Sequence, residues 1–421
     1  MLIKFQLKNF RSIREEQSLS LVAGPGKELL DENTFDSSLP GFPRLLHSAV
    51  IYGANAAGKT NLLKGLQFMQ ALVLNSATMS QPGARLVHTP FRLSEDSRER
   101  PSEFEVVFVD GGVRYEYGFS ADADRFHNEW LIAYPHGRAQ HWFERQYSGA
   151  TQTYEWRFGS RMKGNPRVWR DATRDNALFL STAMQLNSEQ LRPVYAWFQK
   201  KLVVIASWAG QMNAGISYQM LQDEKGKESL LRLIRAADLG ISDLSVRRET
   251  LMPGQAITGN VLLENPASGH IPTILRVSSF HKSVETGDSV AFELNDESHG
   301  TQKLFEAAGA WLNVLNNGEV LVVDELDTSL HPLMTRFIVE LFHRHASNPK
   351  NAQLVFTTHD TSLLDNANFR RDQVWFVEKD QASASHYYPL SNFSPRKGEA
   401  LERGYLKGRY GALPFIGELN L

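Results

Sequence analysis

Gly53-Ala54-Asn55-Ala56-Ala57-Gly58-Lys59-Thr60 is a complete Gly-x-x-x-x-Gly-Lys-[Ser/Thr] phosphate loop, and it directly follows the apolar stretch Ser48-Ala49-Val50-Ile51-Tyr52. This order predicts a strand, a glycine-rich loop and a helix, whose backbone N–H groups and positive dipole end would face the phosphates of a nucleotide. We expect Lys59 to bridge the β- and γ-phosphates and the Thr60 hydroxyl to hold Mg²⁺. A flexible glycine turn is the alternative, which the flanking strand and helix disfavour. The residues expected to contact the nucleotide in this segment are Gly53, Asn55, Ala56, Ala57, Gly58, Lys59, Thr60 and Asn61.

The composition is that of a folded protein with a nearly balanced charge. The chain has 421 residues, of which 42% are hydrophobic, enough for a large core or two to three subdomains. It has no cysteine, so disulfides and Cys-based zinc or redox sites are excluded. No stretch approaches the roughly 20 apolar residues that cross a bilayer, which predicts a soluble, cytoplasmic protein with no membrane partner. The net charge of −2 argues against coating nucleic acid through bulk charge, although it allows a local basic patch.

A second candidate piece of the site is Val320-Leu321-Val322-Val323-Asp324-Glu325. Its four apolar residues fit a buried parallel strand. Asp324 at the strand tip is expected to hold Mg²⁺, directly or through water, and Glu325 to orient or deprotonate the attacking water. Alone, this pattern is often a surface turn, but the phosphate loop favours the catalytic interpretation.

Two further segments narrow the class of phosphate-loop protein. The apolar strand 353–358 ends in His359-Asp360, and a histidine at a strand tip can hydrogen-bond a γ-phosphate. Upstream, Glu297-Ser298-His299-Gly300-Thr301-Gln302-Lys303 begins a helix, whose N-terminal end can bind an anion. A lone histidine is usually structural and a serine before a helix is usually a cap, so only the order of these segments discriminates.

That order resembles the ABC-type ATPase heads of the SMC, RecF and OLD group: phosphate loop, signature helix, acidic strand, D-loop and switch histidine. The resemblance implies that ATP and Mg²⁺ are the cofactors, with Glu325 as the catalytic carboxylate and His359 as the switch residue acting beside Lys59. The segment 329–331 would be the D-loop, with His331 where an Asp is common.

The same resemblance implies a dimer. Ser298, Gly300 and Gln302 would form the signature, which in that group touches the γ-phosphate bound to the other subunit of a head-to-tail pair. Glu297 and His299 replace the usual Leu and Gly there. The opening Lys8-Asn9-Phe10-Arg11-Ser12 looks like the first turn of this group, where the Asn and the Arg approach the nucleotide, so Arg11 is also a candidate nucleotide contact.

A narrower family is more similar still. The segments Glu-Ser-x-Gly-Thr-x-Lys, Asp-Glu-Leu-Asp-x-Ser-Leu-His-Pro and Thr-Thr-His-Asp, with the tail 404–414, look like the stand-alone RloA-type ATPases over nearly the whole chain. Members of that family typically occupy restriction or abortive-infection loci beside an RloB-type gene. The resemblance implies an ATPase that assembles with itself and gates an RloB-like effector, a nuclease by expectation, in anti-phage defence.

A nuclease site is not expected on this chain. OLD-type relatives carry a Toprim nuclease, which needs a Glu followed by an Asp-x-Asp pair, but Asp380 is the last aspartate here. Glu378 is therefore expected to end the last strand of the sheet. Asp122-Ala123-Asp124 is expected to be a solvated loop rather than a metal site.

Two basic segments with aromatic residues are candidates for contact with nucleic acid or protein, although a solvated surface is the simpler interpretation of each. The first contains Trp156, Arg157, Phe158, Arg161, Lys163, Arg167, Trp169 and Arg170. The second runs from Arg396 to Arg409 and is followed by Tyr410.

The sequence therefore predicts an α/β protein of the P-loop NTPase class and ABC-ATPase type, with a mixed sheet and inserted β-rich and helical lobes. The expected boundaries are residues 1–91 and 290–421 for the ATPase, 92–175 for the β-rich lobe and 176–289 for a helical or mixed insertion. Two other functions stay open: a RecF-like ATP-dependent DNA-repair clamp, and a scaffold that nucleotide holds together with negligible turnover.

Overall fold

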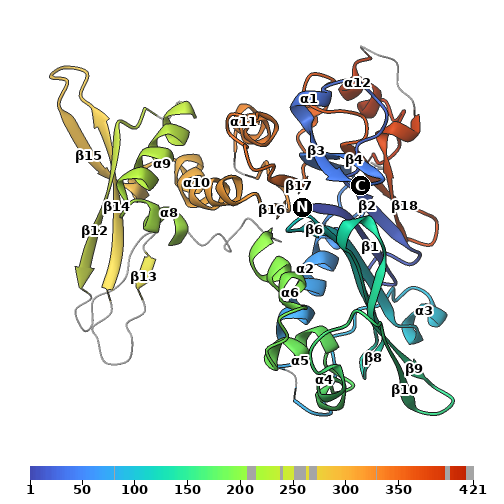
Figure 1. The fold of residues 1–421 in the computed structure, drawn as a ribbon. Coiled ribbons are helices and arrows are strands. Elements are labelled where there is room, and N and C mark those ends of the chain that lie inside the picture. The colour runs from blue at the N-terminus through green and yellow to red at the C-terminus, as the bar shows by residue number, and fades with distance from the viewer. Residues whose placement is uncertain are drawn as a thin grey trace, which may run out of the picture. The chain divides into compact units, whose positions relative to one another are not determined.

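The computed structural model describes residues 1–79, 81–205, 215–237, 240–250, 262–264, 273–328, 330–393 and 399–413. The chain divides into two compact units (Figure 1). Unit 1 comprises Met1–Ala206, Gly318–Glu325 and Val339–Leu421, and unit 2 comprises Ser207–Asn317 and Leu326–Ile338. The expected boundaries at residues 92, 176 and 290 do not separate these units.

A six-stranded mixed sheet in unit 1 carries the phosphate-loop strand. Five strands are parallel, and β19 alone runs antiparallel, against β18. The carboxyl ends of the parallel strands therefore meet at one edge of the sheet, where open α/β sheets bind ligands. In spatial order the strands are β11 (Leu202–Ile205), β16 (Val320–Val323), β17 (Gln353–Thr357), β5 (Ser48–Gly53), β18 (Val374–Lys379) and β19 (Ser385–Pro389).

Two strands of this sheet differ from the sequence-based expectation. The segment 176–289 is expected to be a helical or mixed insertion separate from the ATPase, but Leu202-Val203-Val204-Ile205 within it forms β11 and pairs with β16 of the parallel sheet. This run is short and rich in β-branched residues, which favour a strand once a partner is present. Glu378 does lie near the end of β18, but β18 is followed by β19, so it does not end the last strand.

A second, antiparallel sheet of seven strands also belongs to unit 1. β6 pairs with β1, so the expected β-rich lobe continues a sheet that the N-terminus begins. The turn between β6 and β7 is Gly111-Gly112, and both residues have the positive φ that a two-residue hairpin turn of this kind requires. In spatial order the strands are β10 (Thr153–Phe158), β9 (Gln140–Ser148), β8 (Phe126–Tyr134), β7 (Val113–Ala121), β6 (Ser102–Asp110), β1 (Leu2–Lys8) and β2 (Gln17–Ser20).

Helix α2 (Lys59–Asn75) joins both sheets in one hydrophobic core. Its buried face includes Leu62, Leu66 and Met69, which belong to the same buried cluster as residues of β1, β5 and β6. Gly65 permits the close approach to β1, because an added Cβ would lie 2.5 Å from Leu7 Cδ1. The phosphate loop is thus attached to a helix that is fixed by two sheets.

The remaining elements of unit 1 surround these two sheets (Figure 1). β3 pairs with β4 outside them. These remaining elements of unit 1 are α1 (Leu30–Asn33), β3 (Thr34–Leu39), β4 (Phe42–Leu46), α3 (Glu95–Glu99), η1 (Pro135–Gly137), α4 (Pro166–Ala172), α5 (Phe179–Gln185), α6 (Arg192–Ala196), η2 (Trp197–Lys201), η4 (Thr361–Leu363), η5 (Leu390–Phe393) and α12 (Leu401–Leu406).

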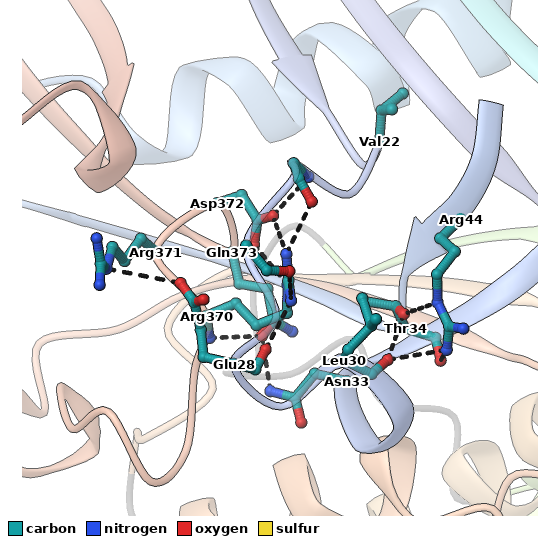
Figure 2. A network of polar contacts seen from close by, with 12 residues as sticks. Val22, Glu28, Leu30, Asn33, Thr34, Arg44, Arg370, Arg371, Asp372 and Gln373 are labelled. Carbon is teal, nitrogen blue, oxygen red and sulfur yellow. Dashed lines mark hydrogen bonds and ion pairs between the residues drawn. The ribbon is translucent and has the colours of Figure 1, made fainter. Parts of the chain in front are cut away.

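Arg370 anchors the segment that connects β2 to α1. Its side chain is 1% exposed and donates to the carbonyls of Gly24, Gly26 and Glu28. It also forms a bidentate pair with Asp372, at 2.7 and 3.0 Å. Figure 2 shows the Arg370 side chain between Glu28 and Asp372, with dashed lines for these contacts. The linker 24–28 is therefore fixed to the parallel sheet.

Unit 2 combines helices with a four-stranded antiparallel sheet (Figure 1). The Ser217 hydroxyl donates to Phe305 O and accepts from Gly309 N, so α8 and α10 cross closely. The helices are α8 (Gly215–Met220), α9 (Glu224–Ala236), η3 (Leu294–Asp296) and α10 (His299–Asn317), and α11 (Pro332–His343) begins in this unit. The strands are β12 (Asp243–Thr250), β13 (Leu262–Glu264), β14 (Thr273–Lys282) and β15 (Ser289–Glu293).

Candidate active site

The phosphate loop lies between β5 and α2, as predicted. β5 is buried at every residue, and the helix begins at Lys59. Ala56 and Gly58 have φ values of 60° and 115°, and such left-handed residues let successive N–H groups turn toward one centre. Lys59 is 6% exposed, and its Nζ donates to Gly53 O at 2.7 Å and to Ala54 O at 3.3 Å.

The exposure of the predicted contacts varies along the loop. Asn55 and Ala56 are exposed at its tip, Ala57 and Gly58 are buried, and Thr60 and Asn61 are half-buried in the first helical turn. Gly53 ends β5, where an added Cβ would lie 2.5 Å from Val377 O of the neighbouring strand. Glycine is therefore required there by packing.

Strand β19 holds the phosphate loop from outside, which the sequence did not reveal. Ser385 Oγ donates to Ala57 O at 2.6 Å, and Tyr387 Oη donates to Gly58 O at 2.6 Å. Burial raises the pKa of Tyr387, and the negative charge of Asp324 adds to the effect. The signal for these contacts in the sequence is that Ser385 and Tyr387 are two residues apart, so they lie on the same face of a strand. Which segment that face contacts is determined by the fold.

The N-terminal turn also reaches the loop, through a residue next to the predicted one. Ser12 Oγ accepts from Asn61 Nδ2 at 2.7 Å and lies 2.7 Å from Ser385 Oγ. Arg11 is exposed, and its guanidinium lies over the Phe10 ring, 5.5 Å from the centroid. The expectation that Asn9 approaches the nucleotide is not met, because its carboxamide binds backbone groups at Phe91, Ser97 and Arg100.

Asp324 and Glu325 follow β16, as predicted, and meet a residue of the next strand. Asp324 is 7% exposed, and its Oδ1 accepts from Thr357 Oγ1 at 2.6 Å. Thr357 Oγ1 in turn accepts from Glu325 N at 2.7 Å. Thr357 is two residues before His359, so a search of strand ends for hydroxyl groups would have found it.

Glu325 and His359 face each other at the carboxyl edge of the sheet. His359 Nε2 lies 3.8 Å from Glu325 Oε1, and their side chains are 41% and 51% exposed. Glu325 has a φ of 52°, which is uncommon for a residue with a side chain and turns its carboxylate out of the strand direction. A solvent-accessible carboxylate and imidazole therefore share the edge of the sheet at which the phosphate loop begins.

The oxygen donors at this edge fit a magnesium ion. The Thr60 hydroxyl and the Asp324 carboxylate are the hard ligands that Mg²⁺ prefers, with phosphate oxygens and water completing such a site. Asp324 is held in place by Thr357, and Thr60 by the first turn of α2. The side chains that would hold the ion are thus fixed by the fold.

The residues predicted to form the signature lie in unit 2, at the start of α10. Ser298 is exposed, and its hydroxyl caps the helix by accepting from Thr301 N at 3.2 Å. Gln302 Nε2 donates to Asn295 O and Glu297 O, so this side chain stabilises the entry to the helix. Gly300 follows in the first turn. In the segment 329–331, His331 is exposed and Ser329 lies outside the described residues.

The two aromatic and basic segments place their rings mostly in the core. Trp169 is 5% exposed, and Trp156 stacks on Phe158. Tyr405 and Tyr410 are buried and stack on Phe376. The buried rings of Trp169, Tyr405 and Tyr410 are therefore not available to stack on bases, whereas Trp156 and Phe158 are half-buried. Arg396 lies outside the described residues.

Asp122 organises its own turn, as expected of a loop. Its carboxylate accepts from the backbone N–H groups of Asp124 and Arg125 and from His127. These contacts hold the pKa of Asp122 well below its usual range, despite partial burial.

Helices of the described residues are all too short or too polar to cross a membrane.

Comparisons with known proteins identify the family. A comparison with curated proteins finds no match. Among solved structures, the chain is similar to one described as "Crystal structure of the SmcHead bound to the C-winged helix domain of ScpA", at 13% identity. That alignment covers 92% of this chain and 97% of the other, with a TM-score of 0.39, too low to compare the folds in detail. The family model described as "AAA domain, putative AbiEii toxin, Type IV TA system" matches residues 48–365. This match includes the phosphate loop, Asp324, Glu325 and His359, and the chain therefore belongs to that family of AAA domains.

Proposed function

We propose that this protein is an ABC-type ATPase that hydrolyses ATP to ADP and phosphate. The observation that carries the proposal is the pairing of Glu325 with His359, at 3.8 Å, on the sheet edge that also presents Lys59 and Asp324. A binding site for nucleotide needs the loop and the lysine alone. A carboxylate held beside an imidazole supplies what hydrolysis needs in addition, a proton acceptor for the attacking water.

Each residue has a distinct part in this reaction. Lys59 and the loop N–H groups bind the β- and γ-phosphates, where charge increases as the bond to the leaving phosphate lengthens. Thr60 and Asp324 would hold Mg²⁺, which would supply further positive charge to offset the charge of the phosphates. Glu325 accepts the proton of the attacking water, and His359 donates a hydrogen bond to the γ-phosphate and orients Glu325.

Self-association is the second part of the proposal. Ser298 and Gly300 lie at the first turn of α10, and the Ser298 side chain is exposed. In the ABC-type heads that this chain resembles, these positions touch the γ-phosphate bound by the other subunit. ATP would then hold two copies, or a larger assembly, together until Glu325 hydrolyses it. Arg11 and Gln302 are proposed as lesser contacts on the same grounds.

The output of ATP turnover is proposed to lie in a separate effector. The family description names a toxin of a type IV toxin–antitoxin system, and the resemblance to RloA-type ATPases implies anti-phage defence beside an RloB-like protein. We propose that assembly on ATP holds this effector, a nuclease by expectation, and that hydrolysis releases it.

Glu325→Gln is the decisive variant, because it keeps the shape of the side chain and removes the proton acceptor. We expect kcat for ATP hydrolysis to fall roughly 10²- to 10⁴-fold while ATP binding is retained. The matched control is Glu99→Gln on exposed α3, which should leave kcat unchanged. Hydrolysis at the wild-type rate by Glu325→Gln would exclude Glu325 as the base and sink the proposed mechanism.

The same variant tests assembly and defence. With ATP and Mg²⁺, Glu325→Gln should accumulate as a dimer or larger species in light scattering, and the added exchange Ser298→Arg should restore the monomer. In cells that carry the whole locus, Glu325→Gln should lose protection in a plaque assay. Full protection by a variant without turnover would instead show that the protein acts as a nucleotide-stabilised scaffold.

A further inference from the structure

Thr357 stands between the strands that carry the two halves of the site. It ends β17, which pairs with β16 on one side and with β5 on the other. Its Cα is opposite Ile51 of β5, two residues before the phosphate loop begins, and its side chain is completely buried. The hydroxyl therefore lies within the sheet, at the edge where β16 and β5 also end.

The Thr357 hydroxyl forms hydrogen bonds with two consecutive residues, Asp324 and Glu325, which have different proposed roles. Its single hydrogen is donated to Asp324 Oδ1 at 2.6 Å, and a lone pair accepts the backbone N–H of Glu325 at 2.7 Å. We propose that Thr357 is a positioning residue that fixes the magnesium-binding carboxylate and the catalytic carboxylate together. This inference rests on the proposed ATPase function and assigns a role to a residue that does not itself touch ATP.

The backbone of Glu325 explains why such a contact is needed. Its φ of 52° lies in the left-handed region, which costs a residue with a side chain on the order of 1–2 kcal/mol. An unheld chain would relax to the extended region and carry the carboxylate away from His359. The hydrogen bond from Glu325 N to Thr357 opposes that relaxation, because it fixes the peptide that leads into Glu325.

The hydrogen bond from Thr357 to Asp324 orients the carboxylate that is proposed to hold Mg²⁺. A carboxylate at a strand tip can rotate about χ1 and χ2, and a donor on one oxygen fixes the plane of the group. Residues that orient metal ligands in this way typically change metal affinity or activity about 10- to 100-fold when they are removed. Thr357 is thus expected to affect both the Mg²⁺ requirement and turnover.

A merely structural role predicts a different result. A buried hydroxyl with two partners stabilises the fold by about 1 kcal/mol per hydrogen bond, wherever it lies. Its loss would lower stability and leave kcat and the Mg²⁺ requirement of the folded molecules unchanged. The two roles are separated by measuring catalysis, Mg²⁺ dependence and stability on the same variants.

The experiment compares Thr357→Val, which keeps the shape, with Thr357→Ser, which keeps the hydroxyl. We expect Thr357→Val to lower kcat about 10- to 100-fold with little change in KM for ATP, and to raise the Mg²⁺ concentration for half-maximal binding of a fluorescent ATP analogue. Thr357→Ser should keep most of the wild-type kcat and a Mg²⁺ requirement close to that of the wild type. The control is Thr335→Val, since the Thr335 hydroxyl is buried without a partner among the described residues, and it should behave as wild type.

Each outcome decides the matter. A kcat and Mg²⁺ requirement for Thr357→Val equal to those of Thr335→Val would overturn the positioning role, and so would a serine variant as impaired as the valine variant. If the valine variant does not fold, Thr357→Cys against Thr357→Ser makes the same comparison at equal size. If the wild-type protein binds but does not hydrolyse ATP, the proposed function fails. The positioning role of Thr357 is then still tested by the Mg²⁺ concentration that each variant needs for half-maximal binding of the ATP analogue.

Discussion

Replacing Arg370 with methionine should destabilise unit 1 far more than replacing its neighbour Arg371. Arg370 is 1% exposed, and its guanidinium holds the carboxylate of Asp372 and three backbone carbonyls of the linker 24–28 (Figure 2). Arg371 is 30% exposed at the side chain and makes one ion pair, to Glu28 at 3.6 Å. The two variants thus remove the same side-chain type from adjacent positions with very different surroundings.

The magnitude follows from the burial of the pair. Removing one partner of a buried ion pair leaves the other charge without compensation, which costs about 3–5 kcal/mol. The three carbonyls belong to a linker that can turn toward water, so the ion pair is the larger contribution. For Arg371, a partly exposed pair contributes about 0–1 kcal/mol. Since a domain is typically stable by about 5–15 kcal/mol, Arg370→Met should remove a large share of the stability of unit 1.

Because the chain has two units, the assay must report on unit 1 itself. Hydrogen–deuterium exchange in increasing urea, followed by mass spectrometry of peptides that cover 22–33 and 48–58, measures the opening of the linker and of β5. We expect Arg370→Met to shift both peptides to lower urea, and Arg371→Met to leave them within about 1 kcal/mol of wild type. Equal shifts for the two variants would refute the claim that this network anchors the linker to the sheet.

Two other outcomes follow from the structure. Burial lowers the pKa of His343 to about 3 and that of His47 to about 4, below the value near 6.5 of an unfolded histidine, so unfolding takes up protons as the pH falls. Stability should be constant above pH 6.5 and decrease by about 1.4 kcal/mol per pH unit for each histidine toward pH 5; His343→Gln should reduce this slope in urea titrations, and an unchanged slope would contradict the assignment. Gly58→Ala should abolish binding of a fluorescent ATP analogue, since the new Cβ would lie 2.3 Å from Ser385 Oγ at a φ of 115°. The control Gly149→Ala, with open space around it and no positive φ, should bind normally.

The sequence predicted those parts of the site that are encoded locally. The phosphate loop, its strand and its helix are contiguous, and Asp324, Glu325 and His359 each follow an apolar run that forms a parallel strand. Because parallel strands present their carboxyl ends at one edge, the order of apolar runs is enough to place such residues together. The α/β fold class was predicted for the same reason.

What the sequence could not provide depends on pairings between distant segments. β11 has only four residues, and nothing near it indicates that β16 will be its partner. Arg370 resembles any arginine in a polar turn, and its burial depends on a linker more than 340 residues earlier in the chain. The division into two units arises likewise from contacts between distant residues, which neither composition nor periodicity reports.

The tether from β19 shows why these distant contacts matter to the chemistry. A trans peptide points its C=O and the following N–H in opposite directions. Ser385 binds the carbonyl of Ala57, so the N–H of Gly58 points away from β19, and Tyr387 binds the carbonyl of Gly58, which turns the N–H of Lys59 the same way. Two side chains of one strand thus orient two successive loop donors toward the opposite side, where a phosphate is bound in loops of this kind. The glycine-rich motif makes the loop conformation accessible, and β19 selects it, so the ability to bind nucleotide depends on residues more than 300 positions beyond the motif.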